Sequence, residues 1–201
     1  MNVALSNPEK LNFIIADNET HYGGSQEWFA DRWRRQAGCG AVAASNLIWY
    51  MRSGYNGKEQ YIELMNEMFS DVKPGIFGVN SSAIFTKGVK RYGARHDMPL
   101  TERILEIPLR KQKRPGTDAV NAFIMSALHS NAPVAFLNLS NGMIKNLGSW
   151  HWVTITAFDS KTMQAKISDY GKTVSVDIEL WLKSSVLGGA FIYLQGDTWI
   201  K

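Results

Sequence analysis

The spacing of hydrophobic residues changes along the chain, from three- and four-residue steps in its first part to alternation after Pro133. Steps of three and four residues are typical of amphipathic helices. They predict four helices, which begin near Gly40, Gly57, Ser82 and Thr117. Gly54 is the expected stop of the first helix, because a glycine commonly follows the last helical residue.

Five later segments alternate apolar and polar residues, as strands with one buried face do. Their sequences are PVAFLNL, HWVTITAF, MQAKISD, TVSVDI and GAFIYLQ. One short helix is expected before the last strand, in DIELWLKSS. Because the other strands follow one another closely, we expect an antiparallel sheet. Helices mainly in the N-terminal half and a sheet in the C-terminal half predict an α+β fold.

Length and composition favour a single domain. A chain of 201 residues with 45% hydrophobic residues can bury one substantial core, so we expect residues 1–201 to form one domain, with 1–25 as a candidate peripheral extension. No segment reaches the roughly 18 apolar residues that span a membrane, and the first residues lack a signal-peptide pattern. We therefore expect a cytoplasmic protein, or a secreted one whose sequence begins at a mature terminus.

Charge and short motifs give no sign of a nucleic acid, a metal or a nucleotide. The net charge is +4, and the basic cluster in LRKQKRPG is followed by turn residues, which favours a solvated loop over a nucleic-acid contact. A single cysteine and four scattered histidines do not form a zinc motif or a disulfide. The glycine pairs in HYGGS and VLGGA lack the phosphate-binding lysine and the dinucleotide pattern. We expect no cofactor.

The lone cysteine, Cys39, lies between two glycines at the start of the first predicted helix. A lone cysteine is most often a small buried hydrophobic residue. At a helix start, however, unpaired backbone N–H groups and the helix dipole favour an anion, and a nearby cation favours the reactive thiolate further. Gly38 and Gly40 also allow close approach of another backbone or a substrate. Cys39 is therefore a candidate nucleophile.

A nucleophilic thiol needs a base, and the chain offers His21, His96, His129 and His151. The first two lie in expected loops, and His129 near a helix end, where it complements the dipole. His151 instead opens the apolar strand HWVTITAF, directly after a loop. A polar ring at the end of an apolar strand fits a site at a sheet edge, and it equally fits a structural histidine with a backbone partner.

The hairpin expected next places an acid beside this histidine. If the two strands after residue 150 join through a turn at 159–161, Val153 pairs with Ile167 and His151 faces Asp169. Opposite side chains on one face have Cβ atoms about 5 Å apart, which lets a carboxylate reach an imidazole.

Asp159 is the alternative partner, but it lies eight residues along the strand from His151. At about 3.3 Å per residue that separation is on the order of 26 Å, too long for a hydrogen bond. Asp159 is better explained as a turn residue. Asp169 has the same alternative explanation, because Tyr170 and Gly171 follow it.

The order of these motifs resembles the papain-like cysteine peptidases. CGAVAASNL at a helix start, HWVTITAFD on a strand and ISDYG eighteen residues after the histidine are similar to the bacteriocin-leader-processing, or double-glycine-leader, peptidases and their stand-alone relatives. The resemblance extends from Gln36 to Asp169. It implies a papain-like architecture, with helices packed on an antiparallel sheet and the nucleophile at a helix start.

The resemblance also implies roles. Cys39 would be the nucleophile, His151 the general base and then acid, and Asp169 the residue that orients the imidazole. Gln36 would supply an oxyanion-hole amide beside the Cys39 backbone N–H. The family's glutamine usually lies six residues before the nucleophile, where this chain has a tryptophan, so Gln26 is the alternative donor.

The expected activity is a cysteine peptidase or a related thiol amidohydrolase, with a peptide or protein substrate. An acyltransferase or transglutaminase-like enzyme would use the same triad with an amine in place of water. A non-catalytic papain-like module would bind a partner through the same groove and leave Cys39 unreactive. The tryptophans near the motifs fit either a substrate groove or core packing; they are Trp28, Trp33, Trp150 and Trp152.

Overall fold

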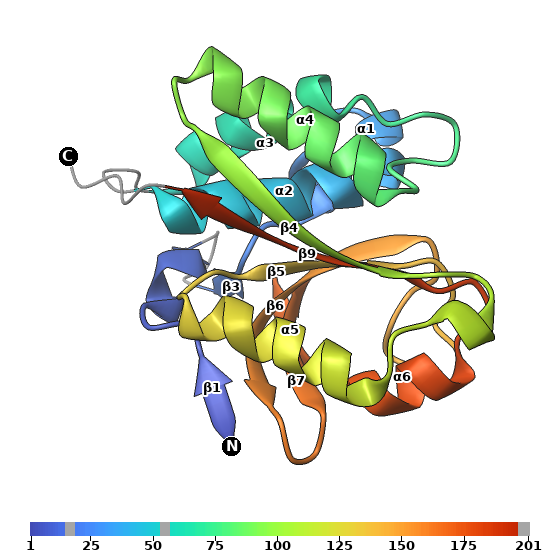
Figure 1. Cartoon of the computed structure of the whole chain (residues 1–201). Coiled ribbons are helices and arrows are strands. Elements are labelled where there is room, and N and C mark those ends of the chain that lie inside the picture. Colours follow the sequence, from blue (N-terminus) through green and yellow to red (C-terminus); the bar gives the residue numbers. More distant parts are fainter. Residues whose placement is uncertain (15–18, 53–56, 197–201) are drawn as a thin grey trace.

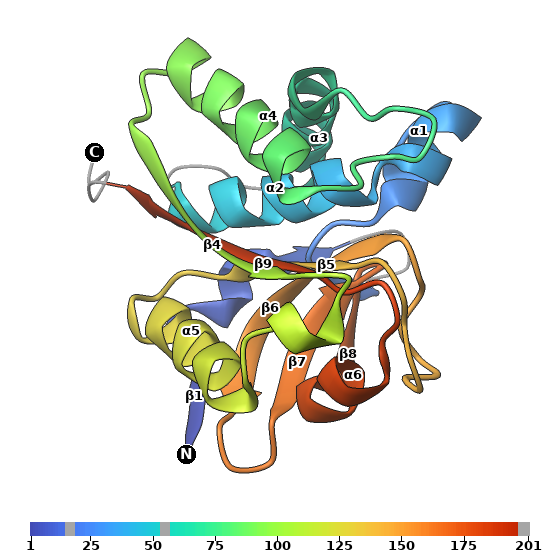
Figure 2. The ribbon, with the colours of Figure 1, turned by 45° about the vertical axis from the view of Figure 1, so that its right-hand side comes forward.

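A computed structural model describes residues 1–14, 19–52 and 57–196. Helices pack against an antiparallel sheet, so the predicted α+β class is confirmed. Helices α1 to α4 lie on one side of the sheet, and α5 and α6 lie on the other (Figures 1 and 2). The predicted stop at Gly54 falls outside the described residues.

The four predicted helices and five predicted strands all form. The helices are α2 (Cys39–Met51), α3 (Lys58–Val72), α4 (Ser82–Arg95) and α5 (Thr117–His129). The strands are β5 (Val134–Asn138), β6 (His151–Asp159), β7 (Gln164–Asp169), β8 (Lys172–Asp177) and β9 (Gly189–Gly196). The short helix expected before the last strand is α6 (Ile178–Ser184).

Five further elements were not predicted. They are β1 (Asn2–Ala4), β2 (Asn12–Ile14), β3 (Thr20–Tyr22), α1 (Arg32–Ala37) and β4 (Leu100–Ile107). Four of them have six residues or fewer, too short for a clear period. The fifth, β4, carries charged residues among its apolar ones in LTERILEI, so its pattern is not the simple alternation of a half-buried strand.

The main sheet has the order β4-β9-β5-β6-β7-β8, and β1 also pairs with β6. The N-terminal residues are part of this structure: β1 pairs Val3 with Phe158, and Leu5, Leu11 and Phe13 are buried in the core. Between β4 and α5 the basic segment forms a 3-10 turn at Lys111–Lys113 with no buried residue, as expected of a solvated loop.

Helix α2 passes through the centre of the molecule (Figure 1). All of its residues from Cys39 to Tyr50 are buried, because α3 covers one side and strand β6 the other. A helix that is apolar on every side is stable only inside a core. Its small residues, such as Ala41, Ala43 and Ala44, allow these neighbours to approach closely.

The pairing of β6 with β7 differs from the predicted register. Ile155, not Val153, pairs with Ile167, and a bulge follows between Ile155 and Ala157. The turn spans residues 160–163 instead of 159–161. Both faces of β6 are buried, so its hydrophobic pattern could not reveal the register, and a bulge adds one residue to only one strand.

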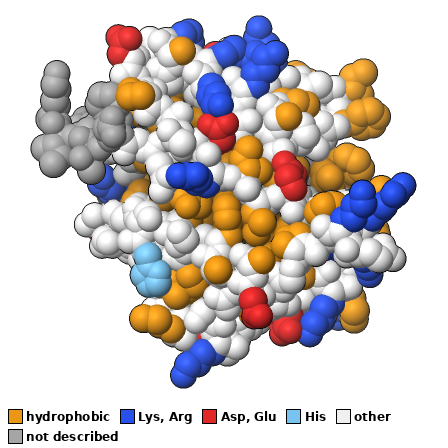
Figure 3. All heavy atoms as spheres, viewed as in Figure 1, with side chains coloured by type: hydrophobic (Ala, Val, Ile, Leu, Met, Phe, Trp, Pro, Cys, Tyr) orange, Lys and Arg blue, Asp and Glu red, His pale blue; other side chains and the backbone are white. Residues whose placement is uncertain are grey.

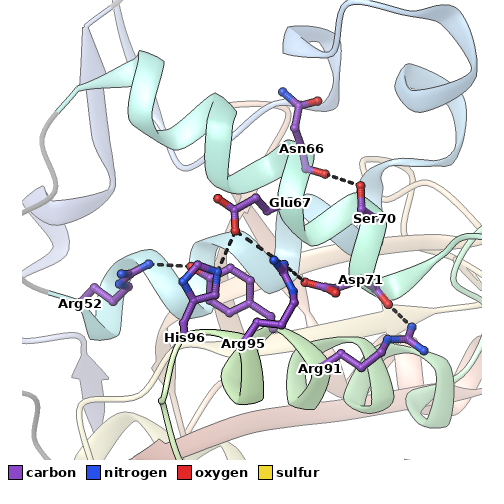
Figure 4. Close-up of polar contacts among 9 residues, drawn as sticks. Arg52, Asn66, Glu67, Ser70, Asp71, Arg91, Arg95 and His96 are labelled. Carbon is purple, nitrogen blue, oxygen red and sulfur yellow. Dashed lines mark hydrogen bonds and ion pairs between the residues drawn. The ribbon is translucent and has the colours of Figure 1, made fainter.

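Helices α3 and α4 are joined by a cluster of charged side chains (Figure 4). His96 Nε2 lies 2.8 Å from Glu67 Oε2, and Arg95 bridges Glu67 and Asp71. Arg91 donates to the backbone carbonyl of Asp71. This cluster gives His96 a structural role, as a link between two helices.

Candidate active site

Cys39 is the first residue of α2, and Gly38 is the N-cap. The Gly38 carbonyl accepts the first helical hydrogen bond, from Val42 N at 2.9 Å. A Cβ at Gly38 would lie 2.4 Å from the Arg34 carbonyl oxygen, so glycine is required for α1 to turn into α2 at this angle. The helix therefore starts with the thiol beside its unpaired N–H groups, where an anion is favoured.

His151 and Asp169 form a close pair on the neighbouring sheet. The imidazole Nε2 lies 2.7 Å from Asp169 Oδ1, and each side chain is about nine-tenths buried, with 10% and 12% exposed. The observed register extended to the start of β6 places His151 opposite Gly171, which makes Asp169 its diagonal neighbour. The predicted direct pairing is wrong, but a diagonal neighbour is still within reach of a long side chain.

A two-residue turn fixes the position of Asp169. Asp169 pairs with Lys172 across Tyr170 and Gly171, which have φ angles of 48° and 74°. Two consecutive residues in the left-handed backbone conformation form a tight hairpin turn whose twist matches the right-handed twist of the flanking strands. Asp169 therefore ends strand β7 immediately before a turn, and its carboxylate points to His151. The sequence suggested either a turn residue or a partner of His151, and Asp169 is both.

The third member of the group, Cys39, faces the same cavity as the imidazole and contributes to its electrostatic environment. Because Nε2 binds Asp169, the nitrogen left for Cys39 is Nδ1. All three residues line one small cavity of about 10 Å³, with space for about one water molecule. The structure thus brings together Cys39, His151 and Asp169 from α2, β6 and β7.

The surroundings of His151 change its pKa strongly. Burial alone lowers the pKa, because it disfavours the charged ring. The hydrogen bond to Asp169, the interaction with Cys39 and the charges of these two groups act in the opposite direction, and the net result is a pKa raised from 6.5 to about 10. The ring is therefore an imidazolium at neutral pH, with a carboxylate on one side and sulfur on the other.

Tyr170 and Gln26 complete one side of this group. The Tyr170 ring stacks on His151, with centroids 5.3 Å apart and planes at 13°. The buried Gln26 amide donates to the Arg35 carbonyl at 2.7 Å and to the Tyr170 hydroxyl at 3.3 Å. Gln26 thus holds Tyr170, which stacks on the imidazole, in place. Both hydrogens of the Gln26 amide are used in these two bonds.

Gln36 has a different position. It is exposed on the last turn of α1 and lines a groove of about 480 Å³ that also includes Cys39. No described residue hydrogen-bonds the Gln36 side chain. Gln36 therefore lies in the outer groove, whereas Gln26 lies in the inner cavity with Asp169.

The remaining histidines lie elsewhere. His21 stacks on Trp28 with ring centroids 5.5 Å apart, His96 belongs to the cluster between α3 and α4, and His129 is in the last turn of α5. Asp159 accepts from Lys161 N at 3.0 Å in the β6–β7 turn, as its interpretation as a turn residue requires. Among the described residues, no group of three or more His, Cys, Asp and Glu could hold a metal ion.

The four tryptophans near the motifs divide into two pairs. Trp152 is buried and stacks on Phe85 at 4.3 Å, and Trp28 packs at the edge of the core. Trp33 and Trp150 are exposed and line the groove beside Cys39. Core packing therefore accounts for Trp28 and Trp152, whereas Trp33 and Trp150 line a groove.

Sequence reasoning missed a buried polar connection between the element that carries the thiol and the one that carries the histidine. Asn46 of α2 donates to the Thr154 hydroxyl of β6 at 3.0 Å. Its amide oxygen accepts from Gly24 N at 3.0 Å and from the Tyr61 hydroxyl at 2.6 Å. A signal was available: an asparagine seven residues after Cys39 lies on the same face of an otherwise apolar helix.

Comparisons with known proteins bear on the fold. No family model and no curated protein matches the sequence. The structure is similar to that of UfSP from C. elegans, a papain-like cysteine protease, with a TM-score of 0.52 at 10% identity. That match covers 98% of this chain and 35% of the UfSP chain. It supports the papain-like fold class.

Two peptidase domains show looser likenesses. One is the peptidase domain of Streptococcus ComA, a bifunctional ABC transporter, with a TM-score of 0.46, 13% identity and coverage of 81% of this chain and 93% of that chain. The other is a double-glycine-motif protease from an AMS/PCAT transporter, solved with its leader peptide, with a TM-score of 0.42, 18% identity and coverage of 79% and 84%. Among the described residues here, no helix is long and apolar enough to cross a membrane.

Proposed function

We propose that this protein is a thiol hydrolase that cleaves a peptide or related amide bond through an acyl-enzyme on Cys39. The observation that carries the proposal is that Cys39, His151 and Asp169 line one small cavity, with His151 hydrogen-bonded to Asp169. A raised imidazole pKa next to sulfur favours an ion pair of thiolate and imidazolium, which is the activated form of a catalytic cysteine. The papain-like fold supports the same class of reaction.

In the first half of the proposed reaction, the Cys39 sulfur attacks the amide carbonyl carbon and forms an S–C bond. His151, protonated at Nδ1, gives that proton to the amide nitrogen as the C–N bond breaks. The amine leaves, and the acyl group stays on sulfur as a thioester. Asp169 keeps the ring oriented through Nε2 in each step.

In the second half, neutral His151 accepts a proton from a water molecule whose oxygen attacks the thioester carbonyl. Collapse of this intermediate releases the carboxylic acid product and returns the thiolate and the imidazolium. An amine that attacks in place of water would give acyl transfer. Product analysis with and without an added amine distinguishes the two outcomes.

The proposal is tested by alkylation of Cys39 with iodoacetamide, which reports one site because the chain has a single cysteine. We expect rapid labelling of the folded protein at pH 6, and loss of that labelling in His151→Ala, because the imidazolium that stabilises the thiolate is gone. His129→Ala, which changes a histidine at the end of α5, is the matched control and keeps the wild-type rate. Slow labelling in all three proteins would favour a non-catalytic binding module.

The oxyanion donor is proposed to be the Cys39 backbone N–H together with the Gln36 amide, which lines the groove beside the thiol. Removing one such donor costs about 10²–10³ in turnover. We therefore expect Gln36→Ala to reduce hydrolysis of an activated ester such as p-nitrophenyl acetate by this factor, with a smaller loss for Gln26→Ala. The reverse order would assign the donor to Gln26.

A further inference from the structure

Large apolar side chains surround the groove beside Cys39, although most residues of this type are buried in the core. Four of them have large exposed fractions: Ile76 89%, Phe77 74%, Trp150 53% and Trp33 46%. We call these four residues the apolar rim. Figure 3 shows exposed hydrophobic side chains along the right-hand edge, where Figure 1 places the loop between α3 and α4. A contiguous exposed apolar patch commonly marks a binding site.

The loop that carries Ile76 and Phe77 is held firmly in place. Gly75 and Gly78 exchange two backbone hydrogen bonds, of 3.1 Å and 2.8 Å, so the two apolar residues lie at the tip of a tight turn. The Val79 carbonyl accepts from the Trp152 indole, which anchors the end of this turn to β6. These backbone contacts place the exposed pair at the tip of the turn, beside β6.

The same anchor brings the loop to the start of α2. A Cβ at Gly40 would lie 2.7 Å from the Val79 side chain, so the loop can pack this closely only against a glycine. Gly40 directly follows Cys39. The sequence suggested that the glycines around the thiol allow another backbone segment to approach closely. At Gly40, that segment is the loop that carries Ile76 and Phe77.

Trp150 has an unusual backbone conformation. Its φ is 55°, in the left-handed region that bulky residues rarely adopt. Strain of this kind costs on the order of 1–3 kcal/mol and occurs mainly at functional sites. Here the strain directs an exposed indole toward Phe77, at 6.4 Å between ring centroids, immediately before His151. The two aromatic rings meet across the groove from different segments.

Apart from the Cys39 sulfur itself, the groove walls that the structure describes carry no charged side chain. None of the described residues that line it is Asp, Glu, Lys or Arg; they are Trp33, Gln36, Ala37, Cys39, Ile76, Phe77, Gly78 and Trp150. An uncharged apolar wall binds apolar groups and disfavours the burial of a charged side chain. The groove volume of about 480 Å³ is within the usual range of small-ligand sites. It is far larger than a glycine residue needs, so the groove has room for a large side chain.

We propose that this groove selects substrates with a bulky, uncharged aliphatic or aromatic side chain next to the scissile carbonyl. The inference rests on the proposed function, because it assumes attack by Cys39. An acyl group bonded to the Cys39 sulfur has its nearest side chain within a few bonds of that atom. Since Cys39 is itself part of the groove wall, such a side chain contacts the apolar rim.

The test compares two alkylating agents that differ only in an aromatic group, iodoacetamide and N-benzyl iodoacetamide. Each second-order rate constant is divided by the rate constant for N-acetylcysteine, which removes the intrinsic reactivity of the reagent. We expect the wild-type protein to favour the benzyl reagent by about tenfold, because the ring leaves water on binding. Phe77→Ser and Trp33→Ser should reduce the ratio of the two normalised rate constants to about one.

Leu109→Ser is the matched control, because Leu109 is 62% exposed and lies outside the groove. It should keep the full preference, and an unchanged melting temperature verifies that each variant is folded. Equal normalised rates for both reagents in the wild type would overturn the inference, as would a preference that survives in both rim variants. Failure of the proposed function has a different signature: iodoacetamide labelling at pH 6 would then be insensitive to His151→Ala.

Discussion

A single imidazole, that of His151, combines burial with two ionisable partners. Burial on its own would keep the ring neutral, but the hydrogen bond to Asp169 and the interaction with Cys39 outweigh it. The folded-state pKa of about 10 is above the unfolded value of 6.5. Protonation of this residue therefore stabilises the folded state fully below pH 6.5, and the contribution is lost as the pH rises toward 10.

The pKa of His151 can be measured by ¹⁵N NMR of the imidazole nitrogens. We expect the ring to stay protonated through pH 8 in the wild type. Its pKa should fall in Asp169→Asn, because the hydrogen bond to the Asp169 carboxylate is the largest of the contributions that raise the pKa. Spectra of His129→Ala identify the signals of a histidine outside the site. A wild-type midpoint near 6.5 would contradict the electrostatic account of the site.

At the scale of elements, the site depends on the contact between α2 and β6. Cys39 and His151 open these two elements, and the buried hydrogen bond from Asn46 to Thr154 joins them further along. Asn46 also binds the Tyr61 hydroxyl of α3. One asparagine therefore sets the distance between the helix and the strand, and we infer that Asn46 is a positioning residue for the thiol and the imidazole.

The variant Asn46→Leu keeps the side-chain volume but removes the Asn46 partner of the Gly24 N–H and the Thr154 hydroxyl. The Tyr61 hydroxyl, in contrast, keeps the Val42 carbonyl at 3.3 Å as an acceptor. We expect a loss of unfolding free energy of roughly 1–3 kcal/mol for each group that stays unsatisfied, measured by urea denaturation. Under conditions where the variant is fully folded, Cys39 alkylation at pH 6 should also slow down. A destabilised variant with unchanged alkylation would limit Asn46 to a structural role.

The control is Asn146→Leu. Asn146 is exposed and donates only to the Ser175 carbonyl, at 2.9 Å. Its replacement should change the unfolding free energy by no more than about 0.5 kcal/mol. The same variant should leave alkylation of Cys39 at the wild-type rate.

At the scale of the whole molecule, the layer of helices α1 to α4 lies on one side of the sheet (Figure 2), and the site combines residues from both. Cys39 comes from the helical side, and His151 and Asp169 come from the sheet. The first residues of the chain contribute to this assembly, because β1 pairs with β6 and Leu5 is 3% exposed. We therefore expect these residues to contribute to stability.

Leu5→Ala tests this contribution. Removing a buried leucine side chain typically costs 2–5 kcal/mol, so we expect a loss of about that size in the unfolding free energy. Val186→Ala, at a residue that is 61% exposed, should cost less than about 0.5 kcal/mol. Equal effects of the two substitutions would mean that the N-terminal segment is only loosely attached.

Periodicity made the long elements predictable, because each of α2 to α5 has a run of residues on one repeating pattern. Strand β4 was missed because charged residues interrupt its pattern, and the β6–β7 register was wrong because both faces of β6 are buried. The proximity of His151 and Asp169 survived that error, since a shift by two residues keeps the same face. The contacts of Asn46 and Tyr170 depend on tertiary packing, which a single sequence does not display.

Strand β9 lies between β4 and β5 in the sheet, although it is the last described strand along the chain. During synthesis, the edges of β4 and β5 that pair with β9 therefore stay unpaired until residues 189–196 have been made. Unpaired strand edges are sites of aggregation. The nascent chain thus carries Cys39 and His151 long before the sheet that supports them can close. We expect a chain truncated after Val186 to bind the dye ANS and to be cleaved rapidly by added protease, whereas the complete sheet would resist both.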